Sequence, residues 1–66
     1  MDAFAEIRAR AMADAMVAYL RLCGGEADLK AADMGISRSE FMRAVAIIKR
    51  EGRAIRTAES RWRVRE

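Results

Sequence analysis

Apolar side chains recur every three to four residues through the first third of the chain, which is the spacing of one helix face. The pattern predicts a helix over about residues 3–22, with Asp2 as its N-cap and Gly24-Gly25 as its stop signal. One apolar stripe consists of Phe4, Ile7, Ala11, Ala15, Ala18 and Leu22, and Met12, Met16, Tyr19, Leu20 and Cys23 lie beside it. This arc is wider than the core of a monomer requires, so part of it is expected to meet a partner.

Two further helices are predicted in the middle of the chain. The first covers about residues 27–34, with Gly35 just past its end. Its inward side chains are Leu29, Ala32 and Met34. The second covers about residues 38–51, because Ser37 and Glu40 have the spacing of a capping box and Gly52 provides a stop. Its predicted buried face is Phe41, Ala44, Val45 and Ile48, and its predicted outward face is Ser39, Arg43, Ala46, Ile47 and Arg50.

After Gly52 the period of the pattern changes from helical spacing to simple alternation, which indicates strands. Ile55 alternates with Arg56, and Trp62 alternates with flanking arginines, so residues 54–65 are predicted to form a hairpin with its turn near residues 58–60. Three aromatic side chains are expected in the core, namely Trp62, Phe41 and Tyr19. The predicted fold is mainly α with a small β-hairpin, a single three-helix winged helix-turn-helix domain over residues 1–66.

Composition narrows the class of protein. The 66 residues are enough for one domain, and 53% hydrophobic with 35% charged residues indicates a compact chain rather than a disordered one. No apolar run approaches the roughly 20 residues that cross a bilayer. The N-terminus lacks the cationic and apolar regions of a secretory signal. A cytoplasmic protein with no membrane association is therefore expected.

The chain carries little of the usual machinery of catalysis. Cys23 is the single cysteine and histidine is absent, so an internal disulfide and an ordinary zinc site are excluded. Cys23 is expected to be a small buried thiol at the end of the first helix. Histidine is the commonest general base, and the carboxylates show no spacing that pairs an acid with a base. Neither an enzyme nor a cofactor is expected, and no small-molecule effector is evident.

Charge is distributed unevenly along the chain. Residues 1–36 carry four cationic side chains and six carboxylates, whereas residues 37–66 carry nine cationic side chains and four carboxylates. Eight of the nine cations in the second half are arginines, whose planar guanidinium groups match phosphate oxygens and guanine edges. The C-terminal half is therefore the half expected to meet a polyanion.

At this point the sequence resembles a known group. The run LKAADMGISRS at residues 29–39, the triplet Arg43-Ala44-Val45 and the pair Glu51-Gly52 look like the winged-helix superfamily. The pattern is closest to the DNA-binding domains of GntR-like bacterial transcription regulators, and the resemblance covers about residues 26–65. It implies double-stranded DNA as the partner, with contacts from Ser37, Arg38, Ser39 and Arg43.

The sequence departs from that family in several places. Ala46 and Ile47 stand where such regulators more often carry polar residues, and Arg53-Ala54 replaces aliphatic residues before the wing. No effector-binding domain follows, so a small stand-alone regulator of bacterial or phage type is expected rather than a ligand-responsive repressor.

The residues themselves also point to a DNA contact surface, because the N-terminal end and outer face of a recognition helix meet base edges. Arg43 or Arg38 is expected to contact guanine, a contact that discriminates by roughly 1–3 kcal/mol. Phosphate or minor-groove contacts are expected from Arg50, Arg56, Arg61 and Arg63, with a further phosphate contact from Lys30.

The wide apolar arc of the first helix leads to a second hypothesis, a symmetric homodimer. Its interface is expected to include Met12, Met16, Tyr19 and Ile47. The main alternative function is a protein-protein interaction module within a larger assembly, which the apolar Ala46-Ile47 patch would suit. RNA is a weaker alternative, because the chain lacks exposed aromatic side chains for base stacking.

Overall fold

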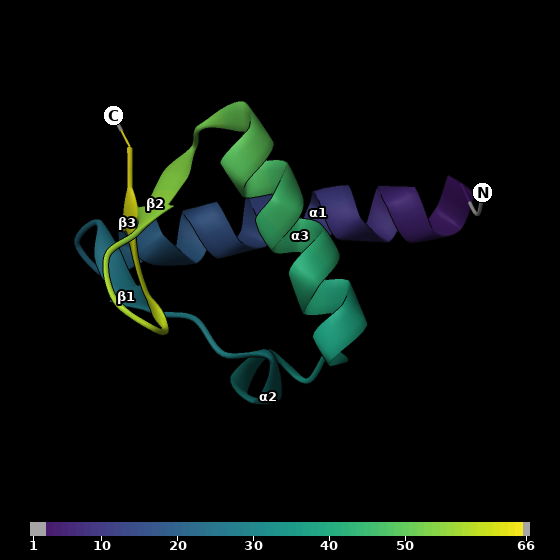
Figure 1. The fold of residues 1–66 in the computed structure, drawn as a ribbon, viewed down its shortest axis with the longest axis horizontal. Coiled ribbons are helices and arrows are strands. Elements are labelled where there is room, and N and C mark those ends of the chain that lie inside the picture. The colour runs from purple at the N-terminus through teal and green to yellow at the C-terminus, as the bar shows by residue number, and fades with distance from the viewer. Residues whose placement is uncertain (1–2, 66) are drawn as a thin grey trace.

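The computed structural model describes residues 3–65 and contains three helices and three short strands. In chain order these are α1 (Ala3–Leu22), β1 (Glu26–Asp28), α2 (Ala31–Met34), α3 (Arg38–Glu51), β2 (Ala54–Arg56) and β3 (Arg61–Val64). Figure 1 shows α3 crossing α1 steeply, with the sheet beside the C-terminal half of α1 and α2 below the crossing. The fold is thus mainly helical with a small antiparallel sheet. No described helix combines the length and the apolar character needed to cross a bilayer.

The sheet has the strand order β1-β3-β2, so its central strand is the last one in the chain. Both edge strands run antiparallel to β3. Trp62 on β3 lies opposite Ala27 on one side and Arg56 on the other. Because side chains alternate across a sheet, Trp62 and Val64 point to the core while Arg61 and Arg63 point outward.

The core lies where α1, α3 and the inner face of the sheet meet. On α1 the small residues Ala9 and Ala13 allow α3 to approach closely, and larger residues fill the space nearer the sheet. The buried hydrophobic residues are Ala9, Ala13, Met16, Val17, Leu20, Leu29, Ala44, Val45, Ile47, Ile48, Ala54, Trp62 and Val64. Met12, Ala27, Met34 and Phe41 pack against this cluster.

The predicted boundaries of α3 are confirmed, and so are the capping box and the glycine that were expected to set them. The Glu40 amide donates to Ser37 Oγ at 3.1 Å, and the Ser37 amide donates back to the Glu40 carboxylate at 3.5 Å, which completes the capping box. Gly52 ends the helix with a φ of 65°, a left-handed conformation that glycine adopts without a steric penalty. The predicted end of α1 at Gly24-Gly25 and the predicted hairpin are also present. Asp2, the predicted N-cap of α1, lies outside the described residues.

The second helix is shorter than predicted. It covers Ala31–Met34 rather than residues 27–34, because Glu26–Asp28 forms an edge strand of the sheet. The sequence Glu26-Ala27-Asp28 has two carboxylates and lacks the alternation of apolar and polar residues that is typical of a strand. The strand forms because β3 offers it a row of backbone partners, which is a long-range effect.

The apolar stripe identified on α1, from Phe4 to Leu22, lies outside the core. Ile7 and Leu22 are 62% and 87% exposed, and the rest of that predicted stripe is exposed as well. The helix instead buries the opposite face, which contains Ala13 and Met16. Two residues expected in the core, Tyr19 and Cys23, are also exposed.

Ile47 lies on the other side of its helix from the one predicted, and Ile55 is an aliphatic residue of the sheet that lies outside the core. Ile47 on α3 was expected to point outward, but only 4% of it is exposed, because α3 packs against both α1 and the sheet and so buries a broad arc. Ile55 on β2 faces solvent, because Ala54 is the residue of this strand that shares the inner face with Val64.

Candidate nucleic-acid interface

The exposed face of α3 carries two parallel rows of polar and basic side chains. Because residues three, four, seven and eleven positions apart share a helix face, Arg38, Met42 and Lys49 form one row. Ser39, Arg43 and Arg50 form the second row, and Ala46 lies between the two. All seven residues are exposed. The capping box fixes the start of this helix, so the first turn of both rows has a defined position in solvent.

Ion pairs elsewhere in the molecule engage Arg10, Arg53 and Arg61. Arg10 on α1 donates to Glu51 at 2.6 Å, and Arg53 is paired with Asp14 and Glu51. The hydrogen bond to Glu51 raises the pKa of Arg10 above its usual value. These pairs connect Glu51 at the end of α3, and Arg53 two residues later, to the middle of α1.

The cations on the exposed face of α3 are not neutralised in this way. Within residues 3–65, no carboxylate forms an ion pair with Arg38, Arg43, Lys49 or Arg50. The exposed face of α3 therefore presents its positive charge to solvent. Fixed positive charge of this kind attracts polyanions and counterions over the surrounding Debye length of about 10 Å.

A groove of about 400 Å³ extends the first row toward the hairpin. It lies between α2, α3 and the turn that joins β2 to β3, and we call it the basic groove. Its cationic lining residues are Lys30, Arg38, Lys49 and Arg56. Its floor is apolar and includes Leu29, Phe41, Val45 and Trp62. Glu59, on the turn, is the one carboxylate among the residues that line it.

Two contacts hold the cations of the basic groove in place. Arg56 Nε donates to the backbone carbonyl of Ala58 at 3.1 Å, which orients its guanidinium group beside the turn. Lys49 Nζ lies 6.0 Å from the centroid of the Trp62 ring, at the outer limit of a cation–π contact. Both contacts leave donors of these side chains available to a ligand, since each uses at most one N–H of a group that has several.

Arg61 and Arg63, also predicted to bind DNA, lie on a different surface. They occupy the outer face of the sheet, where pairing with β1 places Asp28 opposite Arg61 and Glu26 opposite Arg63. Arg61 Nε donates to Glu26 at 2.6 Å, and its terminal nitrogen lies 3.6 Å from Asp28. The hydrogen bond to Glu26 raises the pKa of Arg61. The charge of Arg61 is therefore compensated, unlike that of the cations on α3.

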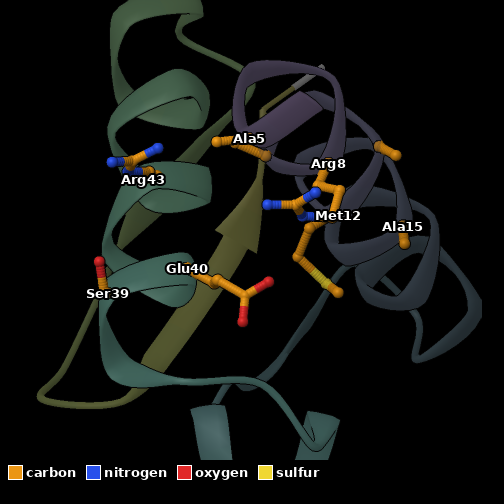
Figure 2. A pocket seen from close by; sticks show the side chains of 9 residues that line it. Ala5, Arg8, Met12, Ala15, Ser39, Glu40 and Arg43 are labelled. Atoms are coloured by element: carbon orange, nitrogen blue, oxygen red, sulfur yellow. The ribbon is translucent and has the colours of Figure 1, made fainter. Parts of the chain in front are cut away.

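The second row of α3 borders a hollow of about 670 Å³, which we call the notch. Figure 2 shows its two walls: Ala5, Arg8, Met12 and Ala15 belong to α1, and Ser39, Glu40 and Arg43 belong to α3. Four alanines of α1 line the notch, so its α1 wall is largely apolar. Ser39 and Arg43 thus stand at an edge between a charged helix face and an apolar recess.

The structure divides the predicted contact residues into three groups. Lys30, Arg38 and Arg56 line the basic groove, Ser39, Arg43 and Arg50 form the second row, and Arg61 and Arg63 lie on the outer sheet face. Ser37, the N-cap, has its hydroxyl engaged with Glu40.

Sequence reasoning missed Lys49 and Met42 as members of the first row. Lys49 is eleven residues after Arg38 and seven after Met42, so helix periodicity alone would have placed all three together. The apolar Ala46-Ile47 patch that would suit a docking module does not exist as a surface, because Ile47 is buried.

Other kinds of site find little support in the described residues. Residues 3–65 contain no group of three or more Cys, Asp or Glu side chains that could hold a metal ion. Comparison of the chain with models of protein families, with curated proteins and with solved structures finds no match.

Proposed function

We propose that this chain is a winged helix-turn-helix protein that binds double-stranded DNA, with α3 as its recognition helix. The uncompensated positive charge of α3 is the single observation that carries this proposal. Arg10, Arg53 and Arg61 are paired with carboxylates, whereas the four cations on the exposed face of α3 have no such partner within residues 3–65. Selection for stability alone gives no reason to collect unpaired like charges on one helix.

The arrangement of α2 and α3 supports the helix-turn-helix assignment. Gly35 has a φ of 68°, and the amides of Gly35 and Ile36 bond back to carbonyls of α2, which turns the chain sharply into Ser37. The next helix, α3, begins at Arg38 with its first residues exposed. A recognition helix enters the major groove by such an exposed first turn.

The basic groove connects the β2–β3 hairpin to the proposed DNA-binding face of α3. Arg56 precedes the turn between β2 and β3, and Lys30 precedes α2, so both flank the first row of α3. In this proposal Arg38 and Arg43 contact base edges, while Lys30, Lys49, Arg50 and Arg56 contact phosphates. A small regulator of bacterial or phage type, acting in the cytoplasm where DNA is accessible, is the role that fits such a surface.

The salt dependence of duplex binding tests the proposal. Fluorescence anisotropy with a labelled duplex of random sequence measures affinity at several salt concentrations. If about five phosphates are neutralised, the logarithm of the binding constant falls with a slope of about −4.5 against the logarithm of salt. A slope near zero, or no binding at low salt, would contradict the proposal and favour a protein-docking role.

A further inference from the structure

Helix α1 is apolar on two opposite faces, and only one of them is used by the fold. The buried face includes Ala13 and Val17, which contact α3 and the sheet. The other face is solvent-exposed along the whole helix and consists of Phe4, Ile7, Ala11, Ala15, Ala18 and Leu22, which we call the exposed stripe. Its two largest aliphatic side chains, Ile7 and Leu22, are 62% and 87% exposed. Burial of such side chains is favourable, so this face is suited to contact with another molecule.

The spacing within the exposed stripe keeps it straight. Successive members are separated by three, four, four, three and four residues, which is an 11-residue repeat of about 3.67 residues per turn. This value is close to the roughly 3.6 residues per turn of an α-helix, so the stripe stays on one side of α1 over its length of about 30 Å. A straight helix laid against it could therefore touch every member.

The two ends and the centre of the exposed stripe match when the helix is reversed. Rotation by 180° about an axis level with position 13 brings position 4 level with position 22, and position 11 level with position 15. The same rotation brings Ile7 level with Tyr19, and Ala18 level with Arg8. The bulky ends of the stripe, Phe4 and Leu22, would then meet each other, and the alanines would meet at the centre. Small residues at the crossing allow two helices to approach closely.

We propose that two copies of this chain associate through their exposed stripes, with the α1 helices antiparallel about a two-fold axis that passes midway between the levels of Ala11 and Ala15 on the exposed side of the helix. A contact of this kind is isologous, so the same residues serve on both chains. Reversal symmetry is a property that a second copy requires and that a lipid surface or an unrelated partner does not. The alanines at the centre of the stripe also favour a second copy over a lipid surface, because they offer little apolar area to a bilayer yet permit close helix packing.

The notch enlarges the surface available to the second copy. Ala11 and Ala15 belong both to the exposed stripe and to the wall of the notch shown in Figure 2. A strip about 30 Å long and about 10 Å wide covers roughly 300 Å² per chain, less than the roughly 800 Å² per partner of a standard interface. The association is therefore a reversible, concentration-dependent dimer rather than a permanent one.

Sedimentation of the whole chain tests the dimer, from about 10 μM to about 1 mM, the range in which so small an interface associates. The wild-type chain is expected to show a monomer–dimer equilibrium. Ala15→Glu places two carboxylates close to the two-fold axis and is expected to weaken association by about 100-fold or more. Ala32→Glu, a control with the same charge change on the exposed surface of α2, is expected to associate like wild type. Circular dichroism checks that both variants keep their helix content.

Cross-linking tests the orientation in a Cys23→Ser background, since Cys23 is exposed. A mixture of Ala11→Cys and Ala15→Cys chains is expected to form disulfides between unlike chains. Each variant alone would cross-link poorly, because like positions are offset along antiparallel helices and a disulfide spans only about 4.4–6.8 Å between Cα atoms. Efficient cross-linking of each variant to itself would indicate parallel helices and overturn the proposed geometry.

Two outcomes would overturn the dimer itself. One is a wild-type chain that remains monomeric at every concentration, and the other is equal association of Ala15→Glu and Ala32→Glu. A monomer that sediments with phosphatidylglycerol vesicles, and loses that binding on Leu22→Glu, would assign the exposed stripe to lipid instead. Duplex binding is measured separately at concentrations too low for association, so either proposal can fail without the other.

Discussion

Arg61 Nε on β3 donates a hydrogen bond to the Glu26 carboxylate on β1 at 2.6 Å. The two strands are neighbours in the sheet although they are the first and third in sequence. Asp28, two residues after Glu26 on β1, lies 3.6 Å from a terminal nitrogen of the same guanidinium group. The outer face of the sheet therefore combines basic residues from β3 with acidic residues from β1. In sequence Arg61 is one more C-terminal arginine, whereas in space it is separated from the charge of α3.

This separation predicts different effects for two arginines that are equivalent in composition. Arg50→Gln is expected to weaken duplex binding and to make the salt slope shallower by about 0.9, because it removes one phosphate contact. Arg61→Gln removes the same charge from the outer sheet face and is expected to leave the slope unchanged. Anisotropy titrations of both variants at matched salt concentrations check this. Equal losses would mean that the sheet face also contacts DNA.

Arg43 is expected to contribute to sequence specificity. Selection of bound sites from a random duplex library should give the wild-type chain an enriched motif. Arg43→Ala is expected to lose preference at one position of that motif, since a bidentate arginine–guanine contact discriminates by roughly 1–3 kcal/mol. Lys49→Ala should weaken binding to all sequences alike and leave the motif intact. A motif unchanged in Arg43→Ala would place base readout elsewhere.

The capping box predicts a difference in stability between two neighbouring serines. Ser37→Ala removes the oxygen that accepts from the Glu40 amide, and is expected to lower the free energy of unfolding by about 1 kcal/mol. Ser39→Ala lies within the first turn of the helix, on the exposed face, and is expected to change it by less than about 0.5 kcal/mol. Urea denaturation followed by circular dichroism measures both. Equal effects would show that the cap adds little.

Ile47 tests the packing of α3 against its two neighbours. Ile47→Ala is expected to destabilise the chain by about 2–5 kcal/mol, and Ile47→Val by about 0.5–1.5 kcal/mol, because the side chain is only 4% exposed. Met42→Ala, at a position that is 53% exposed, serves as the control and should have little effect. Because a domain of this size is marginally stable, the Ile47→Val variant keeps the measurement possible if Ile47→Ala does not fold. A small effect at Ile47 would mean that this residue is not packed in solution.

Sequence patterns predicted the elements whose signals are local. Ser37 and Glu40 are three residues apart and satisfy each other, and Gly52 supplies the left-handed residue that ends α3, so both boundaries follow from short-range chemistry. The burial of Trp62 followed from simple alternation with its flanking arginines. The hairpin was also predicted, although its turn has no strong glycine signal.

The features that were missed depend on contacts between distant segments. β1 becomes a strand only because β3 lies beside it, and neither Glu26 nor Asp28 carries a strand signal of its own. Helix periodicity could not decide which of two apolar faces of α1 would be buried. That choice depends on shape, because Ala9 and Ala13 let α3 approach, and the stripe containing Ile7 and Leu22 remains outside. For the same reason the charge pairing of Arg61 could not be read from the sequence.

The central position of β3 in the sheet has a consequence for folding during synthesis. Neither edge strand pairs with the other, so both wait for β3, which is synthesised after them. Until then the nascent chain can hold helices but no sheet, and Trp62 is not yet available to cover Leu29 and its neighbours. A shortened gene product ending before residue 61 would lose both strand pairings together, and would be expected to be a substrate for proteases rather than a weaker version of the same fold.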